Sequence, residues 1–95
     1  MTSDWPFEDP PNVAVFTTTA VVKRGSPILH VSHDDDDGAW QFHTGQTVDA
    51  GEAMIVALRE IVKLDASIAS LADLPYGWIA TRDTVTSDWK RSPRP

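Results

Sequence analysis

The chain has 95 residues, a net charge of −6 and no cysteine. Its length suits one compact domain, and a hydrophobic fraction of 41% with a charged fraction of 23% is typical of a folded globular protein. The lack of cysteine excludes disulfides, thiolate zinc sites and cysteine nucleophiles. The acidic balance argues against a nucleic-acid partner, because phosphate backbones are bound by clustered Lys and Arg.

The cellular location is inferred from what the chain lacks. Residues 1–6 carry neither the basic nor the apolar region of a signal peptide. The longest apolar run, Met54 to Leu58, is too short to cross a bilayer. We therefore expect a cytoplasmic protein with no membrane contact.

Composition divides the chain into three parts. Residues 1–12 form an acidic, Pro-rich N-terminal segment, residues 13–87 form the α+β domain, and residues 88–95 form a basic tail that contains proline. Proline removes backbone donors, so both end segments are expected to be extended, and the tail to be exposed and mobile. Trp5 and Trp89 lie in or beside these segments and pack either on the domain or on a partner.

The first predicted element is a strand at residues 13–18, which are rich in β-branched and aromatic side chains. Residues 19–22 either extend this strand or form a short helical connection. Residues 23–27 have the composition of a turn.

A β-hairpin is predicted from residues 28–33 and 39–43. The dipeptide Asp37-Gly38 between them is typical of a type I′ turn, which needs positive φ at both central residues. Side chains alternate along a strand, so this turn places Val31 and Phe42 together on the buried side. The opposite side of the hairpin then carries His30, Ser32, Gln41 and His43.

One main helix is predicted to begin at Asp49, because Asp49 and Glu52 have the spacing of a capping box. Apolar residues recur at helical spacing behind it and would face a sheet. Val56 falls on the polar side of this helix. The apolar stripe consists of Met54, Ala57, Leu58, Ile61 and Leu64.

The last elements are a short helical piece around Ile68, Leu71 and Leu74, and a final strand at residues 78–82. Hairpin-linked strands followed by a helix and another strand predict an α+β fold. We expect a small antiparallel or mixed sheet of about four strands, covered by one main α-helix, with short extended termini.

The acidic run Asp34, Asp35, Asp36 and Asp37 at the hairpin is the clearest chemical feature of the sequence. It is not an EF-hand, because with Gly38 as the sixth loop residue the first and twelfth positions hold His33 and Thr44. Two interpretations stay open, a solvated hairpin tip and a weak divalent-cation site.

Catalytic signals are missing from the sequence. His30 and His43 lie nearly opposite each other on the predicted hairpin, but zinc needs three or four converging ligands, which only the aspartates could complete. No nucleophile elbow, Walker loop, dinucleotide fingerprint or zincin motif occurs. We expect a protein that is not an enzyme and holds no cofactor, with no catalytic residue to name.

Three segments together resemble a known family. They are Asp37-Gly38-Ala39-Trp40-Gln41-Phe42 with Gly45, then Leu64-Asp65-Ala66-Ser67-Ile68, and Leu74-Pro75-Tyr76-Gly77-Trp78-Ile79-Ala80-Thr81-Arg82. The resemblance covers roughly residues 13–83. The family comprises small bacterial proteins first described as a domain of unknown function and later grouped, from gene neighbourhoods, with immunity proteins of polymorphic toxin systems. It implies a toxin-binding role and assigns no catalytic or binding residue.

Three functional hypotheses follow. The first is a non-catalytic protein-binding module, of the immunity-protein kind, that binds a basic partner through Asp34, Asp35, Asp36 and Asp37. The second is a metal-binding protein or small metal-dependent enzyme that uses His30, His43 and the aspartates. The third is an accessory subunit of a larger complex, attached through its Pro-rich ends.

Overall fold

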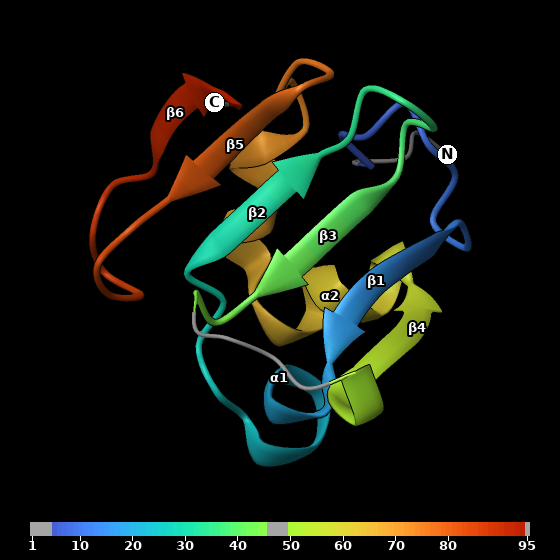
Figure 1. Cartoon of the computed structure of the whole chain (residues 1–95), viewed down its shortest axis with the longest axis vertical. Helices are drawn as coiled ribbons and strands as arrows, with labels where there is room; N and C mark the ends of the chain where they lie inside the picture. The colour runs from blue at the N-terminus through green and yellow to red at the C-terminus, as the bar shows by residue number, and fades with distance from the viewer. Residues whose placement is uncertain (1–4, 46–49, 95) are drawn as a thin grey trace.

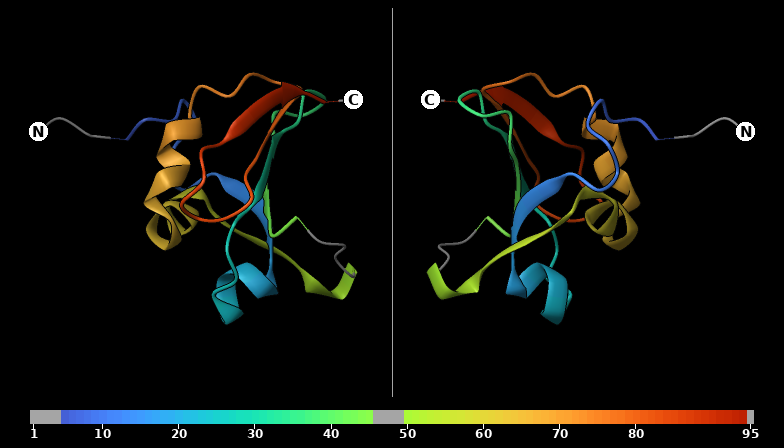
Figure 2. Two further views of the ribbon diagram at one scale, coloured as in Figure 1. Left: turned by 90° about the vertical axis from the view of Figure 1, so that its left-hand side faces the viewer. Right: turned by 90° about the vertical axis from the view of Figure 1, so that its right-hand side faces the viewer.

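The structure, a computed structural model, describes residues 5–45 and 50–94. The elements in chain order are β1 (Ala14–Thr18), α1 (Thr19–Arg24), β2 (His30–His33), β3 (Trp40–His43), the 3₁₀ helix η1 (Ala50–Glu52), β4 (Ala53–Ala57), α2 (Leu58–Leu64), the 3₁₀ helix η2 (Ala66–Leu71), β5 (Trp78–Thr81) and β6 (Lys90–Pro93). One mixed sheet of six strands is covered on one side by the helices α2 and η2, while α1 and η1 lie at one end of the sheet (Figures 1 and 2).

The strands lie in the order β4-β1-β3-β2-β5-β6. β1 and β3 are parallel, and every other neighbouring pair is antiparallel. The α+β class and the mixed sheet are therefore confirmed, whereas the expected number of strands was too low. β4 and β6, the strands that were not predicted, form the two edges.

The connection after β1 is a short helix, which settles the alternative that the sequence left open. The Thr18 hydroxyl accepts a hydrogen bond from the backbone N–H of Val21 at 3.3 Å and caps the start of α1. Gly25 ends the helix with φ at 68°, in the left-handed region that glycine adopts without strain.

β2 and β3 form the predicted hairpin, but its turn differs. His33 lies opposite Trp40, whereas a two-residue turn at Asp37-Gly38 would have placed it opposite Phe42. This shift by an even number of residues keeps every side chain on its predicted face. Gly38 has φ at 74°, but Asp37 is not among the residues with positive φ, so the expected type I′ turn does not form.

The expected helix from Asp49 is only half right. Helix α2 spans Leu58–Leu64, while residues 53–57 form β4, paired along its whole length with β1. Asp49 and the capping box lie outside the described residues. The misfit of Val56 disappears, because in a strand it turns inward and packs on the core while Ile55, 64% exposed, turns outward.

The core fills the space between the sheet and the helices α2 and η2. Its largest buried side chains come from the sheet and from both helices, and burying each leucine contributes about 1.5–3 kcal/mol. The helices α2 and η2 thus cover one face of the sheet. The core includes Val15, Val31, Trp40, Phe42, Leu58, Ile61, Ile68, Leu71 and Leu74.

The described parts of both end segments, residues 5–12 and 88–94, pack on the domain. Phe7 is buried in the core, edge-on to Trp40 with ring centroids 5.4 Å apart, and Trp5 packs beside it. Residues 90–93 of the expected mobile tail form β6, whose side chains are exposed. Trp89 packs on the core and stacks on the guanidinium of Arg82 at 4.1 Å. No helix in the described part of the chain is long and apolar enough to cross a membrane.

Candidate functional site

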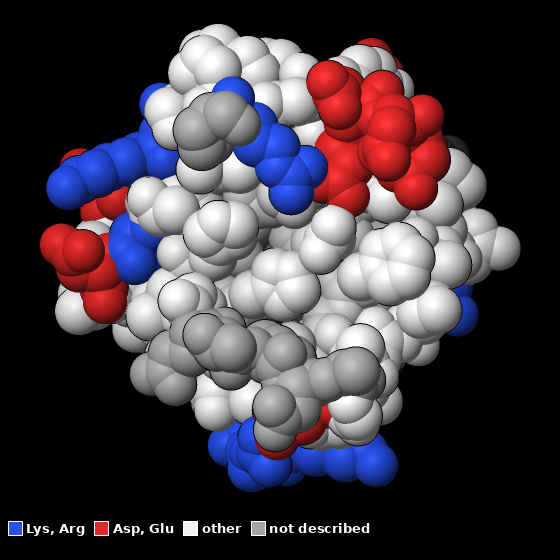
Figure 3. All heavy atoms as spheres, in the orientation of Figure 1, with Lys and Arg blue, Asp and Glu red and all other residues white. Residues whose placement is uncertain are grey.

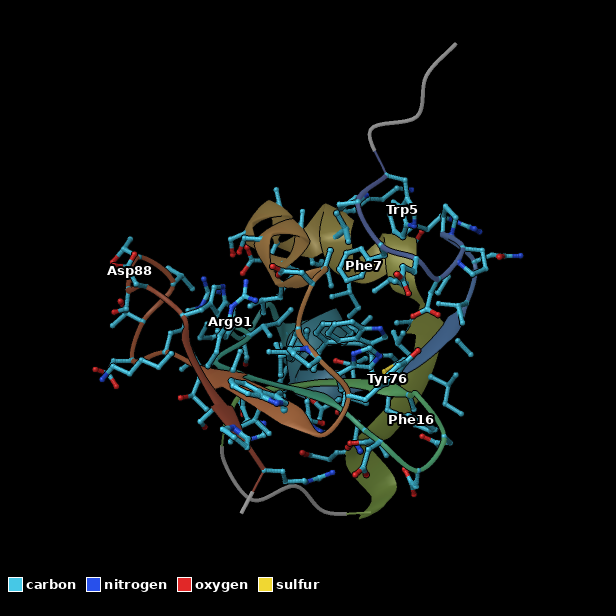
Figure 4. All side chains as sticks on the ribbon, turned by 90° about the horizontal axis from the view of Figure 1, so that it is seen from above. Trp5, Phe7, Phe16, Tyr76, Asp88 and Arg91 are labelled. Carbon is cyan, nitrogen blue, oxygen red and sulfur yellow. The ribbon has the colours of Figure 1, made fainter. Side chains whose placement is uncertain are left out.

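The side of the sheet that faces away from α2 and η2 is called the open face here. Figure 3 looks directly at it, and Figure 4 shows Phe16 on this side while Trp5 and Phe7 lie among the helices. The strand registers align one row of side chains across the whole sheet. That row consists of Ile55, Phe16, Gln41, Ser32, Ile79 and Ser92.

Apolar and charged groups are separated on the open face. Phe16, 41% exposed, and Ile55 lie directly opposite each other on β1 and β4 and form an exposed apolar pair. Figure 3 shows acidic side chains gathered at the end of the sheet where β2 turns into β3, and an uncharged surface over the central strands. A contact surface of this kind combines apolar area with charge at its rim.

The hairpin loop that carries the acidic run is held by its own backbone. Asp34 N–H donates to the Ala39 carbonyl at 2.8 Å, and Gly38 N–H donates to the Asp34 carbonyl at 3.1 Å. The Asp37 carboxylate accepts a further bond from Ala39 N–H at 2.9 Å. The loop is therefore a defined shape and not a loose tip.

The four aspartates do not share one environment. Asp34 is buried, and its two carboxylate oxygens accept hydrogen bonds from Gln41 at 2.7 Å and from Arg94 at 2.9 Å. Asp35, Asp36 and Asp37 are exposed. The sequence placed all four in one partner-binding group, and the structure leaves three of them facing solvent.

A polar chain extends from Asp34 across the open face. Gln41 donates to Asp34 through its amide nitrogen, so its amide oxygen points at Nε2 of His43, 2.9 Å away. An amide oxygen only accepts, so Nε2 of His43 is the donor in this contact. Nδ1 of His43 is buried without a hydrogen-bond partner in the described structure.

The two histidines of the open face favour the neutral form. His30 and His43 are cross-strand neighbours with ring centroids 6.2 Å apart. Burial lowers the pKa of His30 and the nearby Arg94 lowers it further. Burial also lowers the pKa of His43, as does His30, against a smaller opposite effect of Asp34. Neutral imidazoles here provide hydrogen bonds and not positive charge.

The arrangement gives limited support to a cation site. Carboxylate oxygens of Asp34, Asp36 and Asp37 lie within 4.8 Å of one another, and oxygen ligands suit hard divalent cations. However, the Asp34 carboxylate already forms an ion pair with Arg94. Within residues 5–45 and 50–94, His30 and His43 belong to no group of three metal-ligand side chains.

A pocket lies elsewhere, beside α1 and the end of α2. Its volume is about 540 Å³, and its walls are mainly apolar, among them Val21, Ile28 and Val85. Its one carboxylate, Asp65, is bound by Ser67 and Arg82. Burial raises the pKa of Asp65, but the hydrogen bonds from Ser67 and Arg82 outweigh this effect. The net pKa is therefore lowered, and the carboxylate stays ionised and paired.

Sequence reasoning missed three parts of the open face. Phe16 carried a signal, since it alternates with the buried Val15 along a strand that was predicted. Ile55 was hidden by its assignment to a helix. The role of Arg94 had no signal, because it reaches Asp34 from a position 60 residues away.

Comparisons with known proteins add no assignment: no family model matches this chain, and neither does a curated protein or a solved structure. The resemblance to immunity proteins described above stays a prediction.

Proposed function

We propose that this domain is a non-catalytic protein-binding module whose interface is the open face of the sheet together with the exposed hairpin carboxylates. The observation that carries the proposal is the one-sided covering of the sheet. In a sheet with one face on the core and one face in water, the solvated face is usually polar. Among the described residues, α2 and η2 pack on one face only, and the other face displays Phe16 and Ile55.

The apolar pair supplies the affinity in this proposal. Phe16 and Ile55 belong to adjacent strands, so their backbones are fixed and little conformational entropy is lost when a partner covers them. Aromatic side chains, phenylalanine included, are enriched in the buried centre of protein interfaces. Around them the polar chain from Asp34 to His43 has its hydrogen bonds made within the domain.

The exposed carboxylates determine the specificity for a basic partner in this proposal. Asp35, Asp36 and Asp37 project from the end of the sheet, and the chain has a net charge of −6. A basic protein surface would be attracted to this end and oriented before contact. Occlusion of a basic toxin, as an immunity protein does, fits this chemistry and is the partner class we propose.

The role of the hairpin carboxylates is tested by capturing the partner from the native host at low salt. Mass spectrometry then identifies the captured protein. The variant D35N/D36N removes two exposed carboxylates and leaves the buried Asp34 and the loop bond of Asp37 intact. D83N/D88N removes the same charge from the exposed β5–β6 loop and serves as the control. We expect the hairpin variant to lose a basic protein that the control retains; equal loss in both variants would reject the hairpin as the site.

Phe16→Ala tests the apolar part with the partner thus identified. We expect the dissociation constant to rise at least about tenfold, which is the effect of removing a side chain that dominates an interface. Val85→Ala, at a residue 55% exposed outside the open face, is the matched control and should leave affinity unchanged. Full affinity in the Phe16 variant would place the interface elsewhere.

The competing hypothesis of a metal-dependent protein has less support. The clustered carboxylates include one that is bound to Arg94, and the histidines stand apart from them. Equilibrium dialysis with zinc, manganese and calcium distinguishes the two. Stoichiometric binding that D36N/D37N abolishes would favour the metal hypothesis over ours.

A further inference from the structure

The two edges of the sheet are built differently. β6 consists of Lys90, Arg91, Ser92 and Pro93, and charged residues and proline are what proteins place on an edge to prevent pairing with another chain. β4, at the other edge, is Ala-Met-Ile-Val-Ala, with neither a charge nor a proline. One edge is thus protected and the other is not.

The backbone of β4 has hydrogen-bonding groups directed outward. Leu58 N–H donates to the Val13 carbonyl at 2.9 Å, in register with the pairing of β4 and β1. In an antiparallel ladder such hydrogen-bonded positions recur at every second residue, so Val56 and Met54 also bond towards β1. The N–H and C=O groups of the alternate residues, Ala53, Ile55 and Ala57, therefore point away from the sheet.

The sequence of β4 is suited to pairing with itself. An antiparallel arrangement with a two-fold axis at Ile55 places Ile55 against Ile55, each Ala53 against Ala57, and each Met54 against Val56. Small residues meet small ones and apolar residues meet apolar ones on both faces. The arrangement also brings Glu52 at the start of one strand towards Arg59 just beyond the end of the other, which are opposite charges.

We propose that β4 pairs with β4 of a second copy of this chain, so that two sheets join into one continuous sheet in solution. At the axis the two Ile55 residues exchange backbone hydrogen bonds, and the neighbouring Phe16 side chains extend the apolar strip across the junction. A contact through one short strand is small, so the dimer is a weak one in exchange with the monomer.

Sedimentation velocity over a roughly hundredfold range of protein concentration tests this pairing. We expect the weight-average mass to rise towards twice that of one chain. Ile55→Lys places a charge at the axis on both copies and should raise the dissociation constant at least about tenfold. Val85→Lys, the same change at another exposed position, should dimerise like the wild type.

Ala57→Pro tests the backbone directly. Ala57 has φ at −73°, which proline adopts, and its N–H points away from β1, so the substitution removes an outward donor and keeps the β1–β4 pairing. Circular dichroism checks that the variant is folded. We expect a folded monomer.

Two results would overturn the pairing. One is a wild type that stays monomeric over the whole range, and the other is a folded Ala57→Pro variant that dimerises as the wild type does. A monomer that takes up an added strand peptide at this edge would assign β4 to a foreign chain and also reject self-pairing. None of these outcomes depends on the proposed basic partner, which D35N/D36N tests separately.

Discussion

Arg82 joins three segments of the chain through one buried guanidinium group. It donates to the carbonyls of Ile28 and Val85 and to the side chains of Ser67 and Asp65. Its side chain is only 1% exposed, so these hydrogen bonds offset the desolvation of the guanidinium charge. This residue fixes the loop after β5 against η2 and the start of β2.

Arg82→Ala should therefore be strongly destabilising. Removing it leaves the carbonyls of Ile28 and Val85 without this donor and Asp65 with Ser67 alone, and we expect the free energy of unfolding to fall by about 3 kcal/mol. Urea denaturation measures the loss. Arg24→Ala, which breaks an ion pair whose arginine side chain is 58% exposed, should cost less than about 1 kcal/mol. Similar losses in the two variants would show that the Arg82 bonds contribute little.

The histidines of the open face predict a pH dependence of stability. Folding lowers the pKa of His30 and of His43 from 6.5. The unfolded chain therefore binds more protons near that pH, so stability is present above 6.5 and is lost as the pH falls through it. We expect the urea midpoint to decline between about pH 7.5 and pH 5.5.

The variant H30Q/H43Q tests whether these two histidines cause the decline of the urea midpoint with pH, because glutamine does not titrate. Its urea midpoint should change much less over the same interval, while His33 remains in both proteins. An unchanged slope in the variant would assign the titration to other groups.

At the scale of elements, a helix or strand could be predicted where nearby residues determine it, and could not where its pairing with a distant strand determines it. The β2–β3 hairpin was predictable because its alternation and its glycine are local. Residues 53–57 satisfy a helical period as well as a strand, and only their pairing with β1, distant in sequence, decides between the two. β6 gave no signal, since a strand whose four residues are all exposed has no apolar alternation.

The candidate site divides in the same way. The acidic run could be found from the sequence, because charge is visible there. The burial of Asp34 could not, because it depends on Gln41 and on Arg94 at the end of the chain. Sequence reasoning identifies a group of like residues, and packing then determines which of them remain exposed.

β6 is predicted to stabilise the fold although its side chains are exposed. It pairs with β5 along four residues, and Arg91 binds Asp73 at 2.7 Å and the Ser70 carbonyl at 2.6 Å. Deleting residues 90–95 should lower the free energy of unfolding by about 2–4 kcal/mol through the lost backbone hydrogen bonds between β6 and β5. Urea denaturation of the shortened chain measures this. No loss would support an attachment segment, as in the accessory-subunit hypothesis.

At the scale of the whole molecule, charge and apolar area occupy different places on one surface. Acidic groups gather at the hairpin end, and the uncharged surface lies over the central strands (Figure 3). Affinity and association rate should therefore respond to different changes, apolar substitutions acting on dissociation and charge substitutions on association.

Salt should separate these two contributions. The Debye length falls from about 10 Å at about 0.1 M salt to about 3 Å at about 1 M. Over this interval we expect the association rate with a basic partner to fall at least about tenfold for the wild type. D35N/D36N should respond much less, and D83N/D88N should respond like the wild type. Stopped-flow fluorescence gives the rates, and equal salt dependence in all three proteins would contradict steering by the hairpin.

The two ends of the described chain leave the domain in different settings. The chain enters at Trp5, which lies on the helix side, and reaches Arg94, which is bonded to Asp34 beside the acidic hairpin (Figure 4). An affinity tag or a surface tether at the N-terminus therefore keeps the open face accessible. The same tether at the C-terminus would crowd the hairpin and pull on the arginine that holds it. Immobilised binding assays should consequently give different affinities for the two orientations.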